Sequence, residues 1–205
     1  MTTIAVVDHG AGNLVSIGRG LQSAGARVAV ASDPEEFSGA DALVLPGVGA
    51  TGAAMERLDE SGMIEAIRTW PGPLLGICVG MQLFFDASDE ADNDCLGLIP
   101  GRVCRLGATP LPHMGWNDVA HNGDPIFGDI PAGTTFYFVH SYAPVPRGAE
   151  TIIGTADYGE TFAAAVRQGR RVGVQFHPER SGPAGLQLLA NFVASVEAPS
   201  VEEQR

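Results

Sequence analysis

Short apolar runs alternate with amphipathic segments through the first half of the chain. Four runs have the length and composition of buried strands, at residues 4–7, 27–31, 42–45 and 73–77. Between them, residues 14–24 and 52–69 carry apolar side chains at helical spacing, and Asn13 is placed to cap the first of these helices. Because strands that alternate with helices form βαβ units, this half predicts a parallel sheet with right-handed crossovers.

The pattern changes near residue 100, where short strand-like runs follow one another between Gly, Pro and Asn turns. They lie at residues 102–106, 116–119, 135–139, 151–155, 162–167 and 171–176. These runs predict antiparallel strands added beside the parallel sheet, and residues 185–196 predict a closing helix. We expect one α/β domain over residues 1–196, with three layers and a mainly parallel central sheet flanked by helices. Residues 197–205 are predicted to form a frayed polar tail.

The charge balance narrows the classes of partner. The 205 residues carry 24 acidic and 12 basic side chains, which gives a formal net charge of −12. A protein that binds the phosphate backbone usually carries a basic patch, so we expect no nucleic-acid partner. Every basic residue is Arg, which excludes Schiff-base chemistry on a lysine.

Hydropathy and cysteine usage predict a cytoplasmic protein. No segment reaches the roughly 18 apolar residues of a membrane span, and the N-terminus lacks the basic region of a signal peptide, so we expect no membrane association. Cys78, Cys95 and Cys104 form no C-x-x-C pair, which indicates neither a disulfide framework nor a zinc site. We therefore expect a reducing compartment, no metal and no cofactor.

The segment GICVG, with Cys78 at its centre, has the pattern of a nucleophile elbow. It follows an apolar run and precedes a helix-like one, and its two glycines suit a tight strand-to-helix turn. N–H groups at the start of the helix would favour the thiolate form of the cysteine. Taken alone, the segment fits a buried structural cysteine between small residues equally well.

A second string, His177-Pro178-Glu179, follows a predicted strand. Side chains two apart in an extended segment point to the same side, so Glu179 can orient His177. Alone, this string would be read as a surface turn. Since open α/β sheets place their reactive groups at the carboxyl ends of the strands, its pairing with Cys78 predicts a Cys-His-Glu triad.

A third string, PGVGA at residues 46–50, also follows a predicted strand. Glycines there allow backbone N–H groups to approach a ligand, and beside a cysteine nucleophile this predicts an oxyanion hole. Val48 or Gly49 would supply one N–H donor and Val79 the other. The alternatives are an ordinary loop and a phosphate loop, but the segment lacks the Gly-Lys-Ser/Thr ending of a P-loop.

Together these strings resemble the triad class of glutamine amidotransferases. The strings PHMGWN (112–117), YFVHSY (137–142) and VDHGAGNLVSI near the N-terminus are similar to the glutaminase subunit of imidazole glycerol phosphate synthase. The resemblance implies that Cys78 attacks the side-chain amide of glutamine, with His177 as acid and base and Glu179 holding the imidazole. The substrate-binding residues that it implies are Gly47, Gln82, Glu90, His140, Ser141 and Tyr142.

The resemblance also implies a partner. A (β/α)₈-barrel cyclase subunit would take up the ammonia and form imidazole glycerol phosphate and aminoimidazole carboxamide ribotide, in histidine biosynthesis. The family segment that faces this subunit corresponds to His113, Trp116 and Asn117, although Trp116 could instead belong to the core. Arg180 stands where the family often carries Lys, and it is a further candidate for the interface.

Three alternatives remain open at this point. The chain could be the glutaminase subunit of another synthase, such as one that makes pyridoxal phosphate, although PHMGWN argues against this. It could be a non-catalytic elbow protein that acts as a redox sensor or a binding partner, but a sensor needs only an exposed thiol of low pKa. A cysteine hydrolase of other amides would tolerate the loss of Glu90, whereas a glutaminase should not.

Overall fold

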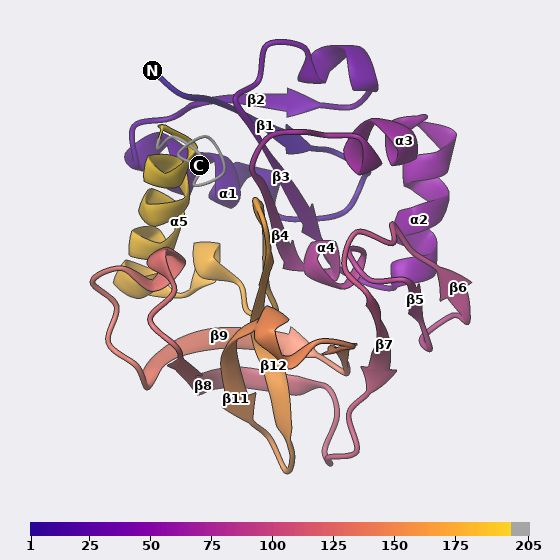
Figure 1. The fold of residues 1–205 in the computed structure, drawn as a ribbon, viewed down its shortest axis with the longest axis vertical. Helices are drawn as coiled ribbons and strands as arrows, with labels where there is room; N and C mark the ends of the chain where they lie inside the picture. The colour runs from indigo at the N-terminus through magenta and orange to yellow at the C-terminus, as the bar shows by residue number, and fades with distance from the viewer. Residues whose placement is uncertain (198–205) are drawn as a thin grey trace.

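The computed structural model describes residues 1–197, so the predicted tail lies outside the described residues apart from Glu197, which ends the last helix. One nine-stranded sheet runs through the molecule (Figure 1). Its parallel half contains, in spatial order, β2 (Arg27–Ala31), β1 (Thr3–Val7), β3 (Ala42–Gly47), β4 (Leu74–Cys78) and β13 (Arg171–Val174). The antiparallel half continues with β12 (Thr161–Gln168), β11 (Ile152–Asp157), β8 (His113–His121) and β9 (Thr134–His140).

A smaller sheet stands beside the antiparallel half. It pairs β10 (Tyr142–Pro146), β7 (Gly101–Arg105), β5 (Ala87–Ser88) and β6 (Asn93–Asp94) in this order. Short 3₁₀ helices complete several loops, namely η1 (Pro34–Phe37), η2 (Pro125–Phe127), η3 (Ala149–Thr151) and η4 (Pro178–Arg180). The sequence pattern had not indicated β5, β6 or β10, whose two to five residues are too short or too rich in proline to show a clear alternation.

Helices cover both faces of the parallel half (Figure 1). α1 (Leu14–Ser23) and α5 (Gly182–Glu197) lie on one face, while α2 (Thr51–Glu60) and α3 (Met63–Arg68) lie on the other. Because both faces are covered, every residue of β3 and β4 is buried. The expected three-layer α/β fold is thereby confirmed, and Asn13 caps α1 through a hydrogen bond from the Ser16 backbone N–H to its side chain.

Several predicted boundaries were wrong; β8, for example, begins at His113, and α5 begins at Gly182. Two further differences have a clear local cause. The helix predicted over residues 52–69 is divided into α2 and α3 by Gly62, whose φ of 69° is left-handed and ends the first helix. The strand predicted to break at Pro46-Gly47 continues to Gly47, in register with β4. Its other neighbour, β1, pairs with β3 only as far as Val44, so the missing N–H of Pro46 interrupts no ladder on that side.

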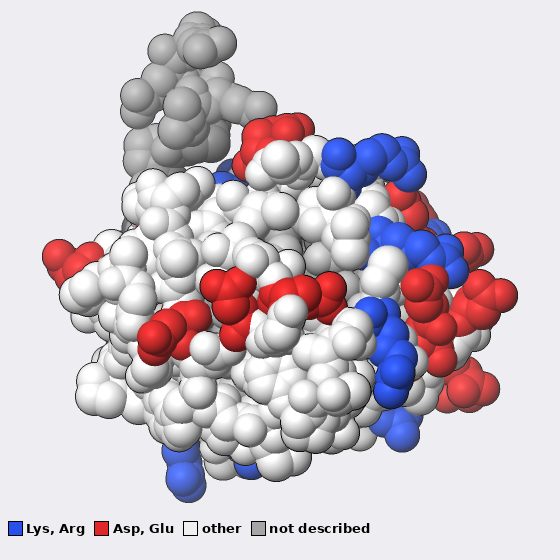
Figure 2. All heavy atoms as spheres, turned by 90° about the horizontal axis from the view of Figure 1, so that it is seen from below, with Lys and Arg blue, Asp and Glu red and all other residues white. Residues whose placement is uncertain are grey.

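The surface seen from below carries a row of acidic side chains across its middle, and the arginines gather toward one side (Figure 2). The described side chains in that view therefore form no continuous basic patch that would suit a phosphate backbone. Within residues 1–197, no helix combines the length and the hydrophobicity needed to cross a membrane.

Candidate active site

Cys78 ends β4 and immediately precedes the one-turn helix α4 (Val79–Gln82). Its φ of 55° and ψ of −110° are strained values for a residue with a side chain, as expected at a nucleophile elbow. A Cβ on Gly80 would overlap the carbonyl oxygen of Leu45, and one on Gly76 would lie 2.8 Å from the carbonyl oxygen of Gly80. Both glycines are therefore required by the close approach of α4 to the sheet.

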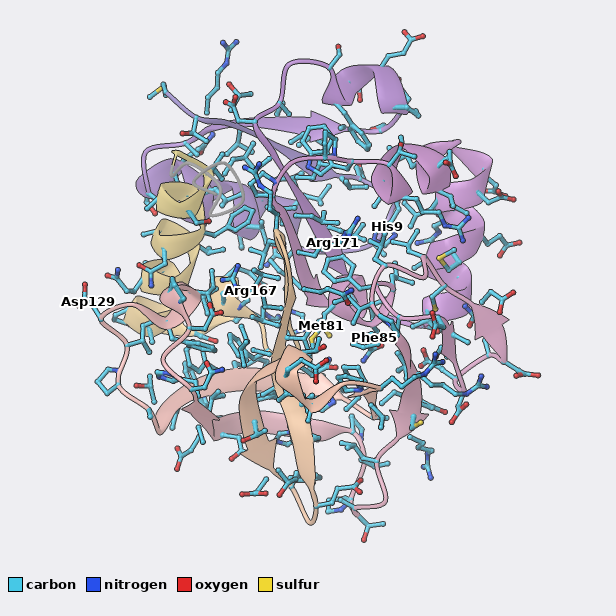
Figure 3. All side chains as sticks on the ribbon, viewed as in Figure 1. His9, Met81, Phe85, Asp129, Arg167 and Arg171 are labelled. Carbon is cyan, nitrogen blue, oxygen red and sulfur yellow. The ribbon has the colours of Figure 1, made fainter. Side chains whose placement is uncertain are left out.

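The strand register brings the predicted strings to one edge of the sheet. Gly47 pairs with Cys78 between β3 and β4, and Ile77 pairs with Val174 between β4 and β13. The segments that leave these three parallel strands therefore meet at their carboxyl ends, where open α/β sheets bind ligands. Met81, which follows the elbow, lies at the centre of the molecule beneath this edge (Figure 3).

His177 and Glu179 form a buried pair beside Cys78. The Nδ1 atom of His177 lies 3.0 Å from Oε1 of Glu179, and both side chains are almost fully buried. Burial alone would lower the pKa of His177, but hydrogen bonding and negative charge from Cys78 and Glu179 outweigh it and raise the pKa to about 10. Within the described residues, His177 Nε2 has no nitrogen or oxygen hydrogen-bond partner, and the group with which it interacts is the Cys78 sulfur. This arrangement favours a protonated imidazole beside Cys78.

A cavity of about 140 Å³ opens over Cys78. Its wall contains most of the residues predicted to bind substrate or to stabilise an oxyanion, together with Val139, which was not predicted. The lining residues are Val48, Gly49, Cys78, Val79, Gln82, Glu90, Val139, His140, Ser141, Tyr142 and His177. Gly47 and Glu179 lie behind this wall, next to Val79 and His177 respectively. The structure thus gathers residues from five separate segments of the chain around the sulfur.

The candidate oxyanion loop is held at its base by His9, which Figure 3 labels. The buried His9 ring donates a hydrogen bond from Nε2 to the Pro46 carbonyl oxygen at 2.7 Å, so His9 is a supporting residue of the loop. Gly49 has a φ of 88°, which suits glycine. Val79 is the first residue of α4, where a backbone N–H has no intrahelical acceptor. N–H donors can therefore face the cavity from both sides.

The sequence did not predict two contacts of the Cys78 sulfur. The Gln175 side chain donates from Nε2 to the Cys78 sulfur at 3.6 Å, and the Val139 carbonyl oxygen lies 3.9 Å from the same sulfur. Gln175 could have been found by the rule that was applied to His177 and Glu179, because it also stands two residues from His177. Val139 contributes only its backbone, which no residue pattern reveals.

The four residues predicted to face a partner divide into two groups. Trp116 is 57% exposed and packs its ring edge-on against Tyr137, while the Arg180 guanidinium lies 5.5 Å from the centre of the same Tyr137 ring. His113 is instead buried, and Asn117 is half-buried and donates to the Asp157 carbonyl oxygen. Only Trp116 and Arg180 therefore present a side chain to an approaching surface.

The residues that the structure describes contain no group of three or more His, Cys, Asp or Glu side chains that could hold a metal ion. Cys78, Cys95 and Cys104 are all free thiols. Burial raises the pKa of the Cys95 thiol to about 11, which leaves it unreactive near neutral pH. Of these three thiols, only that of Cys78 lines the cavity.

The fold and this constellation define a class of enzyme. The family model of the class-I glutamine amidotransferases matches residues 5–196, so the chain belongs to that class. Two solved structures share the fold, a glutamine amidotransferase (TM-score 0.73, 21% identity, 93% of this chain and 98% of that one) and PurLQS from Thermotoga maritima (TM-score 0.72, 17% identity, 96% and 99%).

Curated relatives identify the family within this class. The chain is 47% identical over 198 residues to the imidazole glycerol phosphate synthase subunit HisH of Moorella thermoacetica, across 94% of each chain. It is 46% identical over 199 residues to the same subunit of Vibrio parahaemolyticus, across 93% of this chain and 97% of that one. The chain therefore belongs to the HisH family of synthase subunits. These relatives favour this family over the glutaminase of another synthase.

Proposed function

We propose that this chain is the glutaminase subunit of an imidazole glycerol phosphate synthase and that it acts in the cytoplasm in histidine biosynthesis. It would hydrolyse glutamine to glutamate and ammonia and supply the ammonia to a cyclase subunit. The observation that carries the proposal is the buried Cys78–His177–Glu179 constellation at the floor of a cavity edged by Glu90. Three free cysteines suit a reducing compartment.

In the first half-reaction, the proton of Cys78 already stands on His177 Nε2, and the thiolate sulfur attacks the side-chain amide carbon of glutamine. The C=O electrons move to oxygen, and N–H groups at Val48 or Gly49 and at Val79 stabilise the oxyanion. When the tetrahedral intermediate collapses, the C–N bond breaks and His177 gives its proton to the departing nitrogen. Ammonia leaves, and a γ-glutamyl thioester remains on Cys78.

In the second half-reaction, water attacks the thioester carbon. His177 Nε2 removes a proton from the water, and the C–S bond then breaks to release glutamate and the thiolate. Glu179 holds Nδ1 of the imidazole throughout, so that Nε2 always faces the sulfur. The pair thus returns to its starting state with one water consumed.

Recognition of glutamine depends on charge and on backbone groups. Glu90 is the carboxylate of the cavity wall, and it would pair with the α-ammonium group of the substrate. Gln82 would contribute a polar side chain, and the backbone of His140, Ser141 and Tyr142 would complete the pocket. Gly47 would support the substrate site from behind the wall, where it leaves room for Val79. An amide that lacks the α-ammonium group would leave Glu90 unpaired and bind weakly.

The ammonia acceptor would be a (β/α)₈-barrel cyclase subunit that binds this chain as a heterodimer. Ammonia that escaped into water near neutral pH would become ammonium, which is not a nucleophile, so a sealed passage between the two subunits is expected. Trp116 and Arg180 flank Tyr137 on the outer face of the antiparallel strands and are the anchors that we expect the partner to contact. The product of the complex would be imidazole glycerol phosphate with aminoimidazole carboxamide ribotide.

The test is glutamate release from glutamine by the purified chain, alone and then with the cyclase subunit and its nucleotide substrate. Cys78→Ala serves as the control for background hydrolysis. We expect weak release by the chain alone and strong stimulation by the loaded partner, with both lost in Cys78→Ala. A rate of hydrolysis that is the same with and without the partner would contradict the partner assignment. Glutamate release by the Cys78→Ala variant would contradict the role of the triad.

A further inference from the structure

Gln175 is a buried polar residue whose side chain contacts the reacting sulfur. Its exposed fraction is 0%, and its Nε2 atom donates a hydrogen bond to Cys78 Sγ at 3.6 Å. The register of β4 and β13 pairs Ile77 with Val174, so Cys78, the last residue of β4, and Gln175, directly after β13, lie side by side. This contact is built into the central sheet, since both strands are held by ladders on either side.

The orientation of the Gln175 amide is determined by Gln82. The Nε2 atom of Gln82 donates one hydrogen to Gln175 Oε1 at 3.0 Å and the other to the Tyr142 carbonyl oxygen at 2.9 Å. A backbone carbonyl oxygen can only accept, so the NH₂ group of Gln82 must face Tyr142. Gln82 therefore donates to Gln175, and the oxygen of Gln175 must face Gln82. Its NH₂ group is left to face the sulfur.

The Tyr142 carbonyl is itself held by a second donor. His140 donates from Nδ1 to this oxygen at 2.9 Å, and its Nε2 accepts from Nδ1 of His113 at 3.0 Å. His113 Nε2 in turn faces the Nδ2 amide group of Asn117 at 3.3 Å. Since an amide NH₂ group donates, each imidazole is a single neutral tautomer, and burial lowers the pKa of both rings in agreement with this assignment.

These contacts form one continuous chain of hydrogen bonds from strand β8 to the nucleophile. It runs through Asn117, His113, His140, the Tyr142 carbonyl, Gln82 and Gln175 to the Cys78 sulfur. At every link the donor and the acceptor are determined by the neighbouring link. A buried network in which every member is satisfied holds its side chains in one arrangement. The orientation of the Gln175 amide toward the sulfur is thus determined by this chain of hydrogen bonds.

We propose that Gln175 is a further catalytic residue, whose amide N–H stabilises the Cys78 thiolate, and that Gln82 is the positioning residue that keeps this N–H turned toward the sulfur. A thiolate is a stronger acceptor than a thiol or a thioester, so the hydrogen bond favours the charged sulfur. It acts before attack on the amide carbon and again when the C–S bond of the thioester breaks. This inference rests on the proposed function for its place in the reaction, while the contact itself concerns Cys78 alone.

The test measures the thiolate directly. Alkylation of Cys78 by iodoacetamide is followed from about pH 5 to about pH 9 by mass spectrometry of the Cys78 peptide, without glutamine or partner. Gln175→Met removes the amide at nearly constant length, and Gln175→Glu removes the NH₂ group but still accepts from Gln82. Gln168→Met, at an exposed end of β12, is the matched control for the substitution. Thermal unfolding establishes that each variant is folded.

We expect alkylation near pH 6 to fall about tenfold in Gln175→Met, the usual effect of losing one hydrogen bond to a charged group. The alkylation rate of Gln175→Glu should fall further because its carboxylate repels the thiolate, and the rate of Gln168→Met should equal that of the parent chain. Gln82→Met should lower the rate by a smaller factor. An unchanged pH profile in folded Gln175→Glu would overturn the catalytic role, and an unchanged profile in Gln82→Met would overturn the positioning role. Absence of glutamine hydrolysis would affect only the proposed function, because alkylation needs no substrate.

Discussion

Glu90 Oε2 accepts a hydrogen bond from the backbone N–H of Thr51 at 2.9 Å, and this contact joins the cavity over Cys78 to the first residue of α2. The N-cap residue of that helix, Ala50, has no side chain that could cap it. Glu90 supplies the missing acceptor from 39 residues away, where its charge also complements the positive end of the helix. The same carboxylate is thus a pocket wall and the anchor of the loop that carries Val48 and Gly49.

Substitutions at Glu90 should separate these two roles. Glu90→Gln keeps an oxygen for the Thr51 N–H but removes the charge, so KM for glutamine should rise about tenfold or more with little change in stability. Glu90→Ala should raise KM similarly and also lower the free energy of unfolding by about 1 kcal/mol, the usual cost of losing a helix cap. Steady-state kinetics and urea unfolding measure the two effects. An unchanged KM in Glu90→Gln would show that the Glu90 carboxylate does not bind the substrate.

Gly80→Ala should disrupt the elbow. Its Cβ would overlap the Leu45 carbonyl oxygen, and backbone cannot move aside as a flexible side chain can. We expect a loss of about 3 kcal/mol or more in the free energy of unfolding, together with a loss of glutaminase activity. Gly18→Ala is the matched control, because Gly18 lies within α1 and its nearest neighbour to a new Cβ is 3.7 Å away. That variant should be neutral or slightly stabilised. Equal stability of the two variants would contradict the steric argument.

His140 should make the fold sensitive to acid. Its pKa is lowered to about 4, chiefly by burial, whereas in the unfolded chain a histidine has a pKa of about 6.5. As pH falls from about 6.5 to about 4, His140 is protonated in the unfolded chain but stays neutral in the native chain. The free energy of unfolding therefore falls over this window by about 1–3 kcal/mol. Urea unfolding at several pH values measures this loss. In His140→Asn the same curve should be flatter, and an identical slope would refute the assignment.

Trp116 should contribute to binding of the partner and not to the stability or basal activity of the chain by itself. Because its side chain is 57% exposed, Trp116→Ala should leave the thermal unfolding and the basal glutaminase activity close to those of the parent. Loss of a central aromatic anchor should weaken binding of the cyclase subunit by about 2 kcal/mol. Isothermal titration with the purified partner measures the change. Met114→Ala, at another exposed position of β8, tests whether the effect is particular to Trp116.

Much of the molecule could be predicted from the sequence, because the controlling interactions were local. Apolar runs of strand length, the Asn13 cap and the glycines around Cys78 act within a few residues of their own positions, so periodicity and turn chemistry reveal them. The same holds for the spacing of His177 and Glu179. Gly62 was missed as the boundary between α2 and α3, although its left-handed conformation is also a local signal.

The sequence by itself determined the βαβ order, the elbow and the residue types of the proposed triad. The tertiary structure alone decided which distant groups meet: Glu90 with Thr51, Gln175 with Cys78, and His113 with His140 beneath the surface. These contacts join residues 27 to 97 positions apart, and they depend on strand register and loop packing. Spacing along a chain can suggest on which side of a strand a residue such as Gln175 lies, but it does not show which distant residue it touches, because that partner is set by the elements packed against it.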